Sequence, residues 1–215
     1  MKKLGFTLAE VLITLVIIGV IAAMTVPTLM NNTQGQENKT AFKKAISSMN
    51  QALTMEYALE GNTAATATAT VGTSGDWKGL AAVMTKRTNV ITVITDSLGG
   101  TTPDGISTGT MRTFSTADGL IYVIPEVTVA ACAGDATFDG TKYPDDNCGV
   151  GWVDVNGQKG PNVKVSSASK PQDRFAFTIY ETKVLPGTKP DSVEAQVMYE
   201  KKDVKQEEGG TDTNG

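Results

Sequence analysis

Residues 11–30 read VLITLVIIGVIAAMTVPTLM, a run of 20 residues without a charged side chain. An α-helix rises about 1.5 Å per residue, so 20 residues span about 30 Å, which matches the hydrocarbon core of a bilayer. The sequence therefore predicts a helix that crosses a membrane near the start of the chain. We expect this hydrophobic helix to cover residues 6–30 and to set the arrangement of the rest of the fold.

The charges on either side of the run indicate its orientation. Lys2 and Lys3 precede it, and no comparable basic cluster follows before Lys39. Basic residues are retained on the cytoplasmic side of a membrane. The N-terminus is therefore predicted to be cytoplasmic, with the residues after the run on the other side of the membrane.

Glu10 stands at the edge of this run and complicates its interpretation. A cleaved secretory signal, with small residues at Ala22 and Ala23, and an ordinary single-span anchor are the two simple explanations. Neither explains an acid, because a carboxylate costs about 2.5 to 3.5 kcal/mol at the centre of a membrane helix, and less near the interface. Glu10 is therefore predicted to be functional and to need a cationic partner.

The residues Gly5-Phe6-Thr7-Leu8-Ala9-Glu10, followed by Val11 to Ala23, resemble the N-terminal motif of type IV prepilins and type II secretion pseudopilins. In that family a short basic leader ends in Gly, and the next residue is usually Phe or Met. An acid stands fifth in the mature chain, as Glu10 does when counted from Phe6. Pro27 falls where many members carry a helix-kinking proline. The resemblance covers about the first 60 residues.

This resemblance implies that a prepilin peptidase removes residues 1–5, cutting between Gly5 and Phe6 on the cytoplasmic side of the inner membrane, and methylates the new amine of Phe6. A free α-amino group has a pKa near 7.7 to 8.0 and is largely cationic at neutral pH. Glu10 thereby gains a counter-ion in its own subunit, one helical turn away, or in a neighbouring one. Our hypothesis is that an intermolecular pair sets the axial register of the packed helices.

The function that the resemblance implies is that of a structural subunit of a type IV pilus or pilus-like fibre. Its partners would be further copies of itself, other pilins, the prepilin peptidase, the inner membrane and the pilus or type II secretion assembly machinery. It would end in an extracellular pilus or a periplasmic pseudopilus. A type II secretion pseudopilin and a minor or DNA-uptake pilin remain alternatives. A membrane-anchored binding or enzyme domain is a remote one.

Composition argues against catalysis and gives no direct evidence for nucleic acid as a partner. The 215 residues include no His, which removes the commonest general base and metal-binding imidazole, so we expect no enzyme and no catalytic residue. The chain has 19 Lys and Arg against 23 Asp and Glu, and removing Lys2 and Lys3 leaves 17 against 23. This balance is unlike that of a strongly basic nucleic-acid binder.

Residues 31–61 are predicted to continue the helix beyond the membrane as an amphipathic second half. Apolar residues recur there at helical spacing, and Gly61-Asn62 supplies a stop signal. We expect a rod from Phe6 to about Glu60, interrupted near Pro27 and Gly35. The face predicted to be buried against a globular domain consists of Phe42, Ile46, Met49, Leu53 and Tyr57.

Residues 62–215 are predicted to form a globular α+β domain with an antiparallel sheet packed on the helix. Residues 62–75, rich in Thr and Ala, are expected to be a surface loop, and the tail from about residue 207 is expected to be disordered. Asp118-Gly119 is a plausible hairpin turn. The expected strands are Val90–Thr95, Met111–Thr116, Leu120–Thr128, Gly151–Val155, Phe175–Lys183 and Val193–Tyr199.

The two cysteines, Cys132 and Cys148, fall in the part of the chain expected beyond the membrane, where a disulfide persists. A bridge between them would close a 17-residue loop, which corresponds to about 3 kcal/mol of stabilisation in the chain-entropy model. The alternative is a pair of buried thiols.

Oxygen ligands are abundant in the same region. Asp154 and Asn156 resemble the start of a calcium loop, and Asp135, Asp139 and neighbouring acids lie between the cysteines. The acid that completes an EF-hand is absent, but some pseudopilins hold calcium in their C-terminal region. A calcium site is thus one interpretation, and turns that use Asp, Asn and Gly for backbone reasons are the other. No other cofactor is expected.

Overall fold

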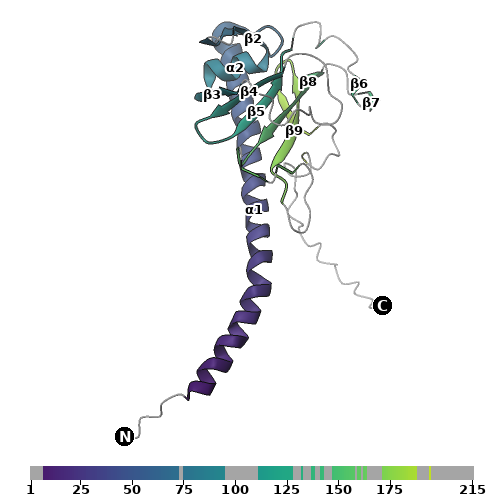
Figure 1. Ribbon diagram of the computed structural model, residues 1–215. Coiled ribbons are helices and arrows are strands. Elements are labelled where there is room, and N and C mark those ends of the chain that lie inside the picture. The colour runs from purple at the N-terminus through teal and green to yellow at the C-terminus, as the bar shows by residue number, and fades with distance from the viewer. Residues whose placement is uncertain are drawn as a thin grey trace, which may run out of the picture.

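The computed structural model consists of a long helix with a globular head on its second half (Figure 1). The structure describes residues 7–72, 75–94, 111–127, 132, 137–138, 141–142, 147–157, 159–160, 162–163, 171–187 and 194. The head is a layer of antiparallel strands packed on the helix, with a second short helix at the far end. The predicted α+β class is therefore confirmed.

The long helix, α1, runs from Leu8 to Glu60 and is 53 residues long, which corresponds to about 80 Å. It ends at Gly61, whose left-handed backbone (φ 69°) donates its N–H to the carbonyl of Tyr57. The helix continues through Pro27 and Gly35, so the interruptions expected there are not found. Figure 1 instead shows α1 curving gently over its first half, which contains Pro27.

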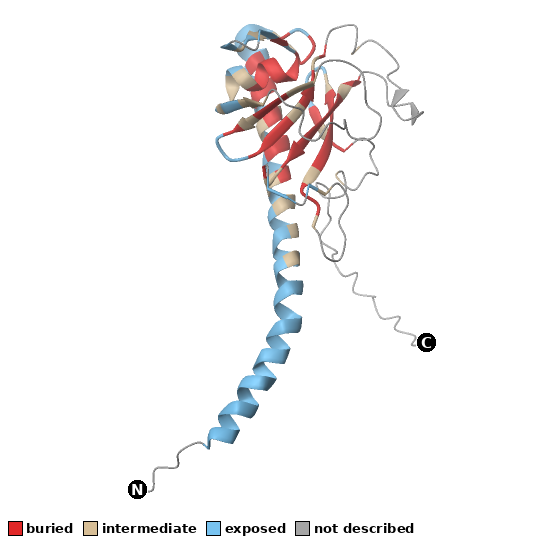
Figure 2. Ribbon diagram, in the orientation of Figure 1, coloured by how far each residue is buried: buried red, intermediate tan, exposed pale blue. Residues whose placement is uncertain are grey.

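The two halves of α1 differ in burial. Figure 2 shows the first half exposed all round and the second half buried on one face. Four of the five predicted face residues are buried: Phe42, Ile46, Met49 and Leu53. The prediction for Tyr57 is wrong, because its side chain is 60% exposed. The neighbouring Glu56 is fully buried in its place.

The main sheet has six strands in the order β10-β9-β8-β5-β4-β3, and every neighbouring pair is antiparallel. The predicted turn at Asp118-Gly119 joins β4 to β5, and the N–H of Thr116 bonds the carbonyl of Leu120 across it. The strands are β3 Val90–Ile94, β4 Met111–Thr116, β5 Ile121–Pro125, β8 Asn147–Asp154, β9 Arg174–Tyr180 and β10 Val184–Pro186.

Three strand predictions need new bounds. The strand expected at Gly151–Val155 begins four residues earlier, at Asn147. The run Phe175–Lys183 divides into β9 and the start of a turn, with β10 folding back on it. The run Leu120–Thr128 shortens to β5. The strand expected at Val193–Tyr199 and the tail from residue 207 lie outside the described residues.

The segment 62–75 is not the surface loop that its composition predicts. Ala64 and Ala67 are fully buried, and the segment leads into a small two-stranded sheet of β1 (Thr68–Thr70) and β2 (Asp76–Lys78). A short helix, α2 (Leu80–Arg87), follows and was not predicted. Small alanine side chains allow the backbone to pack closely here, so a stretch with little apolar area still enters the core.

Two asparagines and an aromatic pair join α1 to the sheet. The side-chain amide of Asn50 donates to the carbonyl of Val184 and accepts from its N–H, both at 2.9 Å, so it occupies the outer edge of β10. Asn38 donates to the carbonyl of Gln172 at 2.7 Å. Phe42 stacks on Phe175 with ring centroids 4.6 Å apart. The head is thus fixed to the second half of α1.

The remaining described strands lie between the two cysteines in the sequence. Cys132 and Cys148 are bonded, as expected, with Cα atoms 4.0 Å apart. Strands β6 (Thr137–Phe138) and β7 (Thr141–Lys142) pair between them. The bridge fixes the start of β8 to the preceding segment.

Candidate processing and assembly site

The start of α1 is organised by a reciprocal pair of residues. Thr7 caps the helix, and its hydroxyl oxygen accepts from the N–H of Glu10 at 3.3 Å. In return, Oε2 of Glu10 accepts from the N–H and the hydroxyl of Thr7, each at 2.8 Å. This arrangement is a capping box, which satisfies N–H groups that the first helical turn leaves without partners.

The capping box gives the Glu10 carboxylate a structural partner as well as a predicted functional one. Its negative charge lies at the N-terminal end of the helix, where the macrodipole favours an anion. Sequence reasoning missed Thr7, although a Thr followed three residues later by Glu is the usual signal for this cap. The carboxylate is therefore held at the helix end before any second subunit is involved.

The predicted cleavage residues, Gly5 and Phe6, lie outside the described residues. Thr7 directly follows Phe6, so a cut after Gly5 would place the new amine one residue before the cap. The pair between that amine and Glu10 therefore stays a prediction. The described geometry places Glu10 at the end of the helix where that pair would form.

The apolar part of α1 presents its side chains to the surroundings. Residues 8–30 are all exposed, including Leu15, Ile18 and Met24. Within the described residues, α1 is the one helix long and apolar enough to cross a membrane, judged by length and composition. None of the described residues of the head covers this segment.

Asp154 and Asn156, the candidate calcium ligands, lie close together. Asp154 is already engaged by Arg174, whereas the side-chain oxygen of Asn156 is buried without a hydrogen-bond partner among the described residues. Asp154 is 4% exposed, and its Oδ2 accepts from Nε of Arg174 at 3.0 Å. Asn156 donates its amide to the buried Asp173 at 2.9 Å. Among the described residues there is no group of three or more His, Cys, Asp or Glu that could hold a metal. The acids between the cysteines, such as Asp135 and Asp139, lie outside those residues.

The electrostatics of this cluster are dominated by burial. Burial raises the pKa of Asp154 to about 6, although the bond from Arg174 opposes this effect. The carboxylate of Asp173 accepts from the backbone N–H groups of Asn162, at 2.8 Å, and Val163. The cluster therefore fixes Asn162 and Val163 beside the end of β8 and the start of β9.

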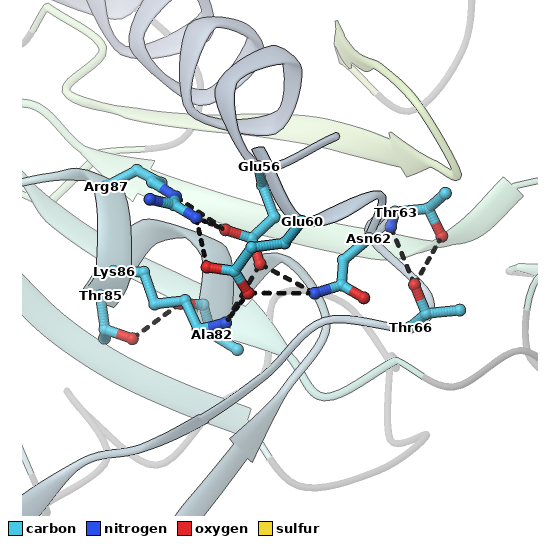
Figure 3. Close-up of polar contacts among 9 residues, drawn as sticks. All are labelled: Glu56, Glu60, Asn62, Thr63, Thr66, Ala82, Thr85, Lys86 and Arg87. Atoms are coloured by element: carbon cyan, nitrogen blue, oxygen red, sulfur yellow. Dashed lines mark hydrogen bonds and ion pairs between the residues drawn. The ribbon is translucent and has the colours of Figure 1, made fainter. Parts of the chain in front are cut away.

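A second polar cluster that sequence reasoning missed joins the end of α1 to α2 (Figure 3). The buried Glu56 accepts from Lys86 at 3.1 Å and from Arg87 at 2.7 Å. The more exposed Glu60 accepts from the same two residues at 2.8 and 2.5 Å. Asn62 adds a bond of 3.1 Å to Glu56. Each acid is thus shared between the two basic residues.

The pKa shifts in this cluster are those expected of stable ion pairs. Burial alone would raise the pKa of Glu56, but hydrogen bonds from Asn62, Arg87 and Lys86 bring it below its ordinary value. The bond to Glu60, opposed by burial, raises the pKa of Lys86. Glu56, Lys86 and Arg87 therefore stay charged at neutral pH, and the cluster serves to dock α2.

Comparison with known proteins bears on the N-terminal segment. A family model described as the prokaryotic N-terminal methylation motif matches residues 1–26. No curated protein and no solved structure matches the chain. The matched residues include Thr7 and Glu10, and they lead into the exposed apolar helix that carries the head. The chain therefore carries at its N-terminus a prepilin-type cleavage and methylation motif, of the kind typical of type IV pilins and pseudopilins.

Proposed function

We propose that this protein is a structural subunit of a type IV pilus or pilus-like fibre, cut between Gly5 and Phe6 and polymerised through α1. The observation that carries the proposal is the first half of α1. It is apolar on every side, exposed on every side, and has one acid, Glu10, in its first turn. A helix that is apolar all round needs an apolar environment.

Two environments would satisfy this segment in turn. The lipid of the inner membrane would cover it in the precursor, and the helices of other copies would cover it in a fibre. The head is attached to the second half of α1, where burial begins at Phe42. The first half is therefore free to exchange lipid for protein while the head keeps its fold.

Glu10 would act at the moment of this exchange. Among the described residues its contacts use Oε2, which leaves Oε1 to accept from a further donor. The methylated amine of Phe6, in the same copy or a neighbouring one, is a cation of the right chemistry. A charge pair within an apolar bundle would favour the one axial alignment that brings the two groups together.

The mature N-terminus tests this proposal most directly. Mass spectrometry of the protein from its host should show a chain that begins with methylated Phe6. A chain that begins at Met1 or Met24 would contradict the proposed processing. The prepilin peptidase, other pilins and the assembly machinery are the partners that this result would support.

Imaging then tests the fibre itself and its location. Labelled antibody against the head should decorate filaments in electron micrographs. Long surface filaments would identify a pilus, whereas loss of exoprotein secretion on deletion would identify a periplasmic pseudopilus. Deletion without effect on any filament would contradict the structural role.

A further inference from the structure

The last turns of α1 carry an exposed apolar patch formed by Met55 and Leu59. Their side chains are 52% and 67% exposed. They stand four residues apart, so they lie next to each other on one helical face. The same outward flank is polar in the preceding turns, where Thr40, Ser47 and Gln51 are exposed. The patch therefore begins abruptly at the end of α1 that lies farthest from the apolar segment.

This patch lies on a different side of α1 from Tyr57. Successive residues turn by about 100° around a helix, so Tyr57 points roughly 200° away from Met55. Tyr57 is also exposed, at 60%. The end of α1 thus offers two exposed apolar positions on different sides, and one serves as an internal control for the other.

Every copy of the chain also carries a surface that could cover the patch. Residues 11–30 are uncharged and exposed throughout. Gly19, Ala22 and Ala23 have the smallest side chains in the middle of this segment, and a Cβ placed on Gly19 would meet nothing within 4 Å. Small residues allow a second helix to approach closely, and long side chains such as Met and Leu fill the space they leave.

We infer that Met55 and Leu59 dock on the apolar segment of α1, around Gly19 to Ala23, in another copy of the chain. This inference rests on the proposed fibre, in which all copies point the same way. The centres of the two surfaces are separated by about 54 Å along α1 at 1.5 Å per residue. The second copy must therefore be displaced by about that distance along the fibre axis, which must be a whole multiple of the rise per subunit.

The contact would be specific to the assembled state. In the membrane all copies sit at the same depth, so the patch of one lies about 54 Å above the apolar segment of the next. Only a copy that has moved out of the membrane can bring the two surfaces level. The patch would then add an apolar contact outside the first half of α1.

Cysteine cross-linking tests the contact in assembled fibres. Both native cysteines are in the disulfide, and the described residues contain no free thiol. The test variant carries Leu59→Cys with Ala22→Cys, and the matched control carries Tyr57→Cys with Ala22→Cys. The two positions are too far apart along one helix to join within a copy, so a link between them joins different copies. After mild oxidation of sheared fibres, non-reducing gels should show a ladder above the dimer for the test pair.

The control pair should give no ladder, because Tyr57 points away from the proposed contact. The single Leu59→Cys variant should give none either, since a single cysteine links two copies at most. Equal ladders from both pairs, or no ladder from fibres of the test pair, would overturn the inference and leave the fibre function standing. Absence of wild-type fibres, together with a chain that is not cut before Phe6, would overturn both the docking inference and the proposed fibre function. If the double variant does not assemble, Leu59→Glu should still lower fibre yield more than Tyr57→Glu. Equal yields would overturn the docking.

Discussion

Glu10 has two roles that one pair of substitutions can separate. Gln at this position can still complete a capping box with Thr7, but it carries no charge. We expect Glu10→Gln and Glu10→Val both to insert and be processed, and both to assemble poorly, because each removes the charge that would pair with the Phe6 amine. Fibre yield by shearing and immunoblot measures the effect.

The exposed Glu37, on the same helix beyond the apolar segment, provides the control for these variants. Glu37→Gln should assemble like the wild type. Normal fibre yield from Glu10→Gln, with loss only in Glu10→Val, would show that the cap matters and the charge does not. The charge-pairing hypothesis would then be wrong.

Asp154 should give the head an unusual dependence on pH. Its pKa is raised to about 6 by burial, so the folded state binds a proton more readily than the unfolded state between about pH 4 and pH 6. Its contribution to the free energy of unfolding should therefore decrease as pH rises through this window and stay constant above it. The expected change is on the order of 1 to 3 kcal/mol.

The comparison with Asp154→Asn isolates this contribution from those of other acids. Denaturant unfolding of the full chain in detergent, from pH 4 to pH 8, gives the difference in free energy between the two proteins. We expect the wild type to lose stability relative to the variant as pH rises from 4 to 6. A constant difference over the whole range would mean that Arg174 keeps the carboxylate ionised throughout.

At the scale of elements, the Glu56 cluster decides how firmly α2 is held on α1. Glu56→Gln leaves Arg87 and Lys86 next to a buried neutral group, and breaking a buried ion pair costs about 3 to 5 kcal/mol. Glu60→Gln, at a more exposed position, should cost about 1 kcal/mol or less. Because the pKa of Glu56 is lowered, its contribution is present above about pH 4.5 and is lost as pH falls below that value.

Denaturant midpoints of the two variants at pH 7 test this assignment, and a second series at pH 4 tests the sign. The difference in denaturant midpoint between Glu56→Gln and the wild type should be smaller at pH 4 than at pH 7. Equal destabilisation by both substitutions at pH 7 would mean that the cluster acts as a surface ion pair.

The elements that were predicted correctly are those whose signals are local. The apolar run, the 3.6-residue spacing from Phe42 to Leu53 and the Asp118-Gly119 turn each depend on neighbouring residues. Helix α2 was missed because its first five residues, Leu80 to Met84, are all buried and show no alternation between apolar and polar positions. Glu56 was missed because its partners lie about 30 residues away in the sequence.

The same distinction holds for the candidate site. The acid and the expected cleavage residues belong to a short motif that can be identified without a structure. The capping partner Thr7 also had a readable signal, which the prediction did not use. Whether Asp154 and Asn156 face an open site depended on Arg174, the first residue of β9, and on Asp173, just before that strand. A local pattern of oxygen ligands therefore could not settle their role.

At the scale of the whole molecule, the structure consists of two parts that meet between residues 31 and 42. No residue of 8–30 is buried, whereas α1 enters the core from Phe42 onward, and the half-buried Asn38 anchors the helix just before it. We expect a chain that begins at residue 31 to fold as a soluble monomer with a thermal midpoint close to that of the full chain in detergent. It should also fail to enter fibres, because it lacks the surface through which copies would pack.

A chain that begins at residue 45 provides the contrast, since it loses Asn38 and the Phe42 ring that stacks on Phe175. Removing a buried phenylalanine alone costs about 3 to 5 kcal/mol, a large part of the stability of a typical domain. Light scattering and circular dichroism should therefore find the first truncation folded and monomeric and the second largely unfolded. If the first truncation unfolds or still polymerises, the apolar segment supports the head in a way that the exposed side chains of residues 8–30 do not indicate.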